Sequence, residues 1–281
     1  MRKSIAIIIT SILVLSGCNK QQSVSDRLLN EVEKAIAINP DSASNLLKSI
    51  SSPEKLDDKA FARWCMLSGK ITDEIFNSIL PTYQLERAYD WYSSHGSPDE
   101  QVQILIYLGR SYFADGDYDK AMSIYTNALD IAGKNKLNNL IGYTYDYIGD
   151  LYREKFMRTE AIKRYEIAAE YFKKEKNTDS YACALRDIGR EYAQMDSLSH
   201  ALNILIIADS VAANTSNINV TASINNALGN IYSMQNKYDK AEEYLLKALL
   251  TGREKMPDYV ALIDLYLSLI HISEPTRPLY I

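Results

Sequence analysis

The feature that most constrains this chain is a short pattern that returns four times at a constant spacing. A leucine or isoleucine stands directly before a glycine, and a tyrosine follows three positions later. The repeated glycines are Gly109, Gly149, Gly189 and Gly229, and an alanine stands twelve residues after each of them, at Ala121, Ala161, Ala201 and Ala241. A fixed 40-residue period is typical of a stacked solenoid, whose usual function is to bind along a surface.

Each unit is predicted to be a pair of amphipathic helices with a short turn between them. Apolar residues recur at spacings of three and four on both sides of a break such as Asp115-Gly116-Asp117. The glycines fall inside the first helix, where glycine costs roughly 1 kcal/mol relative to alanine. We therefore expect close packing of the second helix there, with the first alanine facing the glycine and the tyrosine filling the space beside it. A large residue further along the second helix would plug the seam, namely Tyr125, Tyr165, Leu205 or Leu245.

The pattern resembles the tetratricopeptide repeat over residues 102–253. The family's usual period is shorter than the one found here, so each unit of this chain is longer, and the family's helix-ending proline is missing. The resemblance implies an all-α fold, a right-handed superhelical solenoid of antiparallel helix pairs. We predict four repeats over 98–256 and the start of a fifth at 257–266.

The region before the regular repeats, 25–97, is predicted to hold degenerate helical repeats that cap the solenoid. Extending the period upstream places Gly69 in phase, and Pro81 would open the second helix of that unit. Two further short helices would be separated at Asn39-Pro40, with Asp41 or Ser42 capping the second.

The N-terminus is predicted to be a secretory signal peptide over 1–17, followed by a linker over 18–24. Two basic residues precede an apolar run from Ile5 to Leu15. Leu15-Ser16-Gly17-Cys18 resembles the bacterial lipobox, which implies cleavage before Cys18 and its acylation. Asn19 after the cysteine would direct the lipoprotein to the outer membrane of a Gram-negative cell, facing the periplasm.

The C-terminal residues 267–281 are predicted not to be natural sequence. The eleven residues from Leu267 to Arg277 match the in-frame translation of a transposon-library sequencing adapter. The natural chain would then be interrupted in the first helix of the fifth repeat, and the tail is left out of the fold prediction.

Composition and motifs argue against enzymatic chemistry and against nucleic-acid binding by this portion. The chain carries 31 basic and 36 acidic residues, a net charge of −5, without a basic stripe. Its three histidines, His95, His200 and His271, form no metal or catalytic motif, so no cofactor or metal is expected. Cys65 and Cys183 fall in first helices three repeats apart and are not expected to form a disulfide.

In the tetratricopeptide family the first helices line the concave, partner-binding face. Transferring those positions to this sequence gives Tyr107, Arg110, Tyr143, Tyr147, Arg153, Arg186, Arg190, Asn226 and Asn230. Arg186, Arg190, Asn226 and Asn230 would form an anion-binding cluster suited to a peptide carboxylate. The alternative is that Asp146, Asp150 and Asp187 neutralise the arginines within the groove.

These features favour a non-enzymatic scaffold, anchored in the cell envelope by lipid, that binds a peptide or protein partner. Two alternatives remain open at this stage. One is the periplasmic sensor half of a membrane-spanning signalling or transcription regulator whose output domain is missing. The other is an outer-membrane assembly lipoprotein that docks further subunits.

Overall fold

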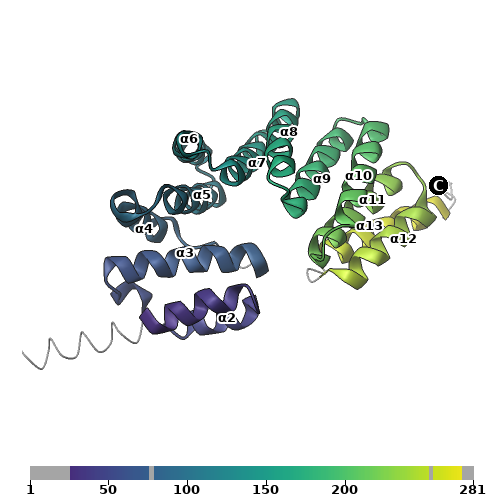
Figure 1. Cartoon of the computed structure of the whole chain (residues 1–281). Coiled ribbons are helices and arrows are strands. Elements are labelled where there is room, and N and C mark those ends of the chain that lie inside the picture. The colour runs from purple at the N-terminus through teal and green to yellow at the C-terminus, as the bar shows by residue number, and fades with distance from the viewer. Residues whose placement is uncertain (1–25, 76–78, 253–255, 274–281) are drawn as a thin grey trace, which may run out of the picture. The chain divides into compact units, whose positions relative to one another are not determined.

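The computed structural model describes residues 26–75, 79–252 and 256–273, and throughout these ranges the regular secondary structure is helical (Figure 1). The predicted all-α fold is confirmed. The signal peptide, Cys18 and residues 274–281 of the predicted tail lie outside the described residues. The chain divides into two compact units, unit 1 (1–135) and unit 2 (136–281), which are treated separately.

Unit 1 is a succession of helices in which each regular helix packs on the next. Residues 26–36 are helical. They are followed by α2 (Pro40–Lys48), a 3-10 turn (Pro53–Lys55), α3 (Asp58–Ile75), α4 (Thr82–His95), α5 (Pro98–Ala114) and α6 (Tyr118–Asn135). The core between α3, α4 and α5 contains Phe61, Leu85, Tyr92 and Leu108. Helix α4 begins directly after Pro81.

Unit 2 is also a succession of helices, each between 14 and 18 residues long. They are α7 (Asn138–Glu154), α8 (Arg158–Lys174), α9 (Thr178–Gln194), α10 (Leu198–Ala212), α11 (Ile218–Met234), α12 (Tyr238–Thr251) and α13 (Met256–Ser273). Helices α5, α7, α9 and α11 begin at 98, 138, 178 and 218, which reproduces the period of the sequence. Within the described ranges no helix combines the length and apolar composition needed to cross a bilayer.

Each repeated glycine lies against a large side chain from the second helix of its pair. A Cβ added at Gly109 or Gly149 would overlap the ring of Tyr125 or Tyr165. At Gly189 and Gly229 it would come within 2.8 Å of Leu205 and 2.6 Å of Leu245. The large seam residue, and not the predicted alanine, is therefore the immediate neighbour of the glycine. The first alanine contributes only its backbone oxygen in the last two repeats, because its own side chain is too short to reach.

The turn inside each repeat uses the same left-handed geometry. The residue at this position is Gly116, Phe156, Asp196 or Asn236, with φ between 57° and 80°. The next amide donates a hydrogen bond to the carbonyl of the repeat tyrosine, as from Met157 to Tyr152 at 2.8 Å. This is the Schellman arrangement that ends a helix, and it favours glycine or asparagine at the left-handed residue. Phe156 departs from that preference.

The cap of α2 corrects one detail of the sequence prediction. The Asn39 side chain accepts a hydrogen bond from the Ser42 amide at 3.0 Å, so Asn39 is the N-cap. Pro40 is then the first helical residue, a position where its missing N–H costs nothing. Asp41 and Ser42, predicted as caps, lie inside the helix.

Candidate partner-binding groove

Unit 2 contains a groove of about 760 Å³ on the side formed by its first helices. Residues near the C-terminal ends of α7, α9 and α11 line it, together with residues of α13. The repeat period brings the same helical position of successive repeats to this surface, which explains why one side of the unit is hollowed. The lining side chains include the basic Arg153, Arg158 and Arg190, the acidic Glu154, Glu191 and Asp264, the amide of Asn230, and the apolar Phe156 and Met234.

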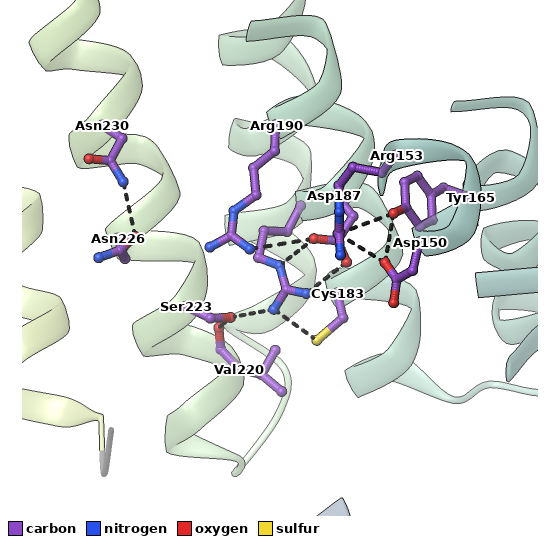
Figure 2. Close-up of polar contacts among 11 residues, drawn as sticks. Asp150, Arg153, Tyr165, Cys183, Asp187, Arg190, Val220, Ser223, Asn226 and Asn230 are labelled. Carbon is purple, nitrogen blue, oxygen red and sulfur yellow. Dashed lines mark hydrogen bonds and ion pairs between the residues drawn. The ribbon is translucent and has the colours of Figure 1, made fainter. Parts of the chain in front are cut away.

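A polar cluster on α9 lies beside this groove (Figure 2). The Arg186 guanidinium donates two hydrogen bonds to the Asp187 carboxylate, at 3.0 and 2.7 Å, and a third to the Ser223 hydroxyl at 3.0 Å. Asp187 is only 5% exposed. Desolvation of this carboxylate opposes its charge, but Arg186 outweighs it and holds the pKa of Asp187 below its usual value. Arg186 is therefore engaged by an internal partner.

Arg153 and Arg190 also pair with carboxylates of this cluster, but their side chains are more exposed than that of Arg186. The Arg153 guanidinium lies 2.9 Å from Asp150, and the Arg190 guanidinium lies 3.5 Å from Asp187. Their side chains are 38% and 41% exposed. The Tyr165 hydroxyl donates to Asp150 at 2.8 Å, so the seam residue beneath Gly149 also positions the ion pair of Arg153. The two guanidinium groups are thus oriented while remaining partly open to the groove.

The remaining carboxyl of this cluster belongs to Asp146, on α7. Its Oδ1 is buried and has no hydrogen-bond partner among the described residues. Desolvation, together with the charges of Asp150 and Asp187, raises its pKa well above the usual value. Burial therefore favours the neutral, protonated form of Asp146 over its carboxylate. The groove itself is lined by three basic residues, Arg153, Arg158 and Arg190, and by three acidic ones, Glu154, Glu191 and Asp264.

Of the two asparagines in the predicted anion cluster, Asn226 is buried and Asn230 lies on the groove. Asn226 is 6% exposed, and its amide donates to the buried Asp258 carboxylate at 2.8 Å. Asn230 donates to the Asn226 oxygen at 3.0 Å but is itself exposed and lines the groove. Arg190 and Asn230 therefore lie on the groove. Arg186 and Asn226 do not, because neighbouring carboxylates bind them.

The other predicted partner-binding residues of unit 2 lie on α7. The Tyr143 hydroxyl accepts hydrogen bonds from Ser180 at 2.9 Å and from Asn177 at 3.1 Å. Its ring packs edge-on against Phe172, so this side chain joins α7 to the start of α9. Tyr147 is half-buried.

Tyr107 and Arg110 belong to unit 1 and do not form part of this groove. Tyr107 is 4% exposed, its ring covers Gly69, and its hydroxyl donates to Asp73 at 3.0 Å. Arg110 pairs with the same aspartate. The prediction that Tyr107 lines an open face is wrong, because its ring packs over Gly69 within the core.

Residues that the family positions did not indicate complete the groove. Arg158 at the start of α8 pairs with the buried Glu191 at 2.9 Å. Phe156 and Met234 are 80% and 47% exposed. The repeat register could have indicated Phe156, since it aligns with Gly116 and Asn236 at a turn where an aromatic residue is unfavourable.

Within the described residues, no cluster of histidine, cysteine and acidic side chains has the arrangement of a metal site. Cys65 and Cys183 are free cysteines. Burial raises the pKa of the Cys65 thiol to about 12, so the reactive thiolate is disfavoured.

Comparison with known proteins identifies the repeat. Models of the family described as tetratricopeptide repeat match residues 105–138 and 221–256. The photosystem I assembly protein Ycf3 of Rippkaea orientalis is 32% identical over 91 residues, which cover 32% of this chain and 52% of that protein. This chain therefore matches about half the length of that curated relative.

Solved structures show the same fold at low sequence identity. A Rap protein complexed with Competence and Sporulation Factor aligns with a TM-score of 0.71 at 19% identity, over 86% of this chain and 68% of that chain. BtubC from P. vanneervenii aligns at 0.55 and 16% identity, over 94% and 96%. The apo quorum sensor NprR from B. thuringiensis aligns at 0.57 and 16% identity, over 91% and 73%. The chain carries tetratricopeptide repeats at 105–138 and 221–256 within an all-helical fold of this kind.

Proposed function

We propose that this protein is a non-enzymatic scaffold that binds a segment of another polypeptide in the groove of unit 2. The observation that carries the proposal is the placement of Arg153, Arg190 and Asn230, from three successive first helices, on one groove of about 760 Å³. Arginine forks bind carboxylates through paired hydrogen bonds, and asparagine amides bind peptide groups. A groove lined from three successive first helices suits an extended or helical segment better than a small metabolite.

The comparisons support this class of partner. The Rap structure contains Competence and Sporulation Factor, and NprR is described as a quorum sensor. These two proteins share the fold at 19% and 16% identity, so they support the kind of function and not the identity of the ligand. The chemistry of the partner is predicted instead from the partly exposed guanidinium groups of Arg153 and Arg190 on the groove.

The test is capture of peptides from a phage-displayed random library by the purified protein and by the R153E/R190E variant. Charge reversal at two groove arginines should reduce capture by at least about thirtyfold, since losing one partner of a charge pair costs about 2 kcal/mol or more. The matched control is K163E/K247E, which reverses two exposed lysines of unit 2 that do not line the groove. Equal enrichment on both double variants and on wild type would rule out this groove as the binding surface.

We extend the proposal to the N-terminus: Cys18 carries the lipid that holds the scaffold in the cell envelope, in the outer membrane facing the periplasm. The lipobox-like Leu15-Ser16-Gly17-Cys18 supports it. Two or more acyl chains give stable attachment, at about 0.8 kcal/mol per buried methylene. In a Gram-negative host, wild-type protein should incorporate alkynyl-palmitate and sediment with outer membranes, whereas C18S should do neither. Label on C18S would place the lipid elsewhere.

A second candidate is the sensor half of a membrane-spanning regulator. It is favoured by similarity to a signal-transduction ATPase with a tetratricopeptide repeat sensor from Pyrococcus horikoshii, with a TM-score of 0.57 at 18% identity. The natural gene sequence after codon 266 would decide, since this candidate requires a hydrophobic span followed by an output domain. Co-purification with a β-barrel would instead favour an assembly lipoprotein.

A further inference from the structure

Phe156 combines two unfavourable properties. Its φ of 57° places a bulky aromatic residue in the left-handed region, where asparagine and glycine are the usual residues. Its side chain is also 80% exposed. The equivalent turn residues of the other repeats, Gly116, Asp196 and Asn236, are small or polar and suit this conformation. Neither the fold nor the turn requires phenylalanine here.

Exposed apolar side chains recur in the turns of unit 2. Met157 is 47% exposed, Met195 43% and Met234 47%, and each lies at or beside the turn between the helices of its repeat. The corresponding turn of the repeat in unit 1 is Asp115-Gly116-Asp117. Large exposed apolar groups that gather on one surface mark contact sites for partners. Phe156 and Met234 line the groove itself, and we call this pair the apolar lip.

The apolar lip lies on the same groove as the exposed guanidinium groups. Arg153 is three residues before Phe156, and Arg190 lines the same groove from the first helix of the next repeat. The Arg158 guanidinium lies 5.9 Å from the centre of the Phe156 ring and is itself held by Glu191. The acidic side chains Glu154 and Asp264 also line the groove, and both are exposed. One groove therefore presents an apolar pair of side chains and the partly exposed guanidinium groups of Arg153 and Arg190 to the same ligand.

We propose that Phe156 is a partner-binding residue, retained in a strained conformation because its ring and Met234 receive an apolar side chain of the partner while Arg153 and Arg190 bind an acidic group of the same segment. The inference rests on the proposed function and specifies its ligand: a peptide segment with a large aliphatic or aromatic residue close to an aspartate, a glutamate or a free C-terminal carboxylate. Strain at an exposed site that the fold does not need is typical of a functional residue.

The test compares F156N with wild type in stability and in binding. Asparagine suits the left-handed turn, so the melting temperature should rise by about 2–4 °C. Affinity for peptides selected from the random library on wild-type protein should fall at least about tenfold, because loss of an aromatic anchor is among the costlier changes at an interface. F156L, which keeps an apolar side chain and the strain, should keep most of the affinity. L250S removes an 81% exposed leucine outside the groove and should change neither binding nor peptide choice.

The outcomes separate this inference from the proposed function. If no peptide is enriched on wild type relative to R153E/R190E, the groove does not bind peptides and the proposed function fails. If peptides are enriched but carry no apolar residue near an acidic group, or bind F156N as tightly as wild type, the role of Phe156 is wrong while the groove remains a binding site. A drop in the stability of F156N would show that Phe156 serves the fold.

Discussion

Replacing Gly109 by alanine is expected to lower the free energy of unfolding by about 2 kcal/mol, although alanine is the better helix former by about 1 kcal/mol. The added Cβ would overlap the ring of Tyr125, whose Cδ1 would lie 2.7 Å away. Tyr125 is 1% exposed and enclosed by its neighbours, so its ring cannot turn aside without shifting α6 against α5. Chemical denaturation followed by circular dichroism measures the change.

The matched control is Gly133→Ala in the same helix pair. In the described part of the chain, no heavy atom lies within 4 Å of a Cβ added there, so the substitution should raise the free energy of unfolding by about 0.5–1 kcal/mol. Alanine at Gly109 and alanine at Gly133 are therefore expected to change the free energy of unfolding in opposite directions. Combining G109A with Tyr125→Ala should cost less than the sum of the single changes, because the clash disappears. A gain in stability from G109A alone would show that close packing is not why this glycine recurs.

The repeated glycines explain why so much of the fold could be predicted from sequence. A single glycine in a helix is ambiguous, but four in phase predict a shared close contact, and each indeed faces a large seam residue. The helix starts follow the same period. Local details were less predictable: Asn39, Asp41 and Ser42 are all good caps by type, and only the backbone geometry shows that Asn39 is the one used.

The candidate site was only partly predictable, because helical phase indicates which side of a helix a residue occupies and not what neutralises it. Arg186 and Arg190 occupy similar positions on α9, yet Arg186 is bound by Asp187 and Ser223 while the Arg190 side chain stays 41% exposed. Part of the difference comes from Ser223 of the following repeat, whose contact with Arg186 the period does not specify. The same holds for Asn226, which Asp258 binds from α13.

The largest loss of stability in unit 2 is expected from Asp187→Asn. This change leaves the Arg186 guanidinium, 18% exposed, without its bidentate carboxylate, and breaking a buried ion pair on one side costs about 3–5 kcal/mol. The folded-state pKa of Asp187 is depressed, so the stabilisation is present above the unfolded pKa of about 3.9 and is lost as the pH falls through the folded value. Denaturation between about pH 3 and pH 7 should show the two proteins converging in acid. The double variant R186M/D187L should be more stable than D187N, because it leaves no unpaired buried charge.

Asp146→Asn is the control in the same cluster. It is expected to raise the free energy of unfolding at neutral pH, whereas Asp187→Asn lowers it. Desolvation and the neighbouring carboxylates raise the folded-state pKa of Asp146, so its contribution to stability is full below the unfolded pKa of about 3.9 and is lost as the pH rises through the folded value. Asparagine removes this loss, and D146N should therefore be more stable than wild type at neutral pH and equal to it in acid. If D146N and D187N shifted the free energy of unfolding in the same direction at neutral pH, the opposite pKa shifts of Asp146 and Asp187 would be wrong.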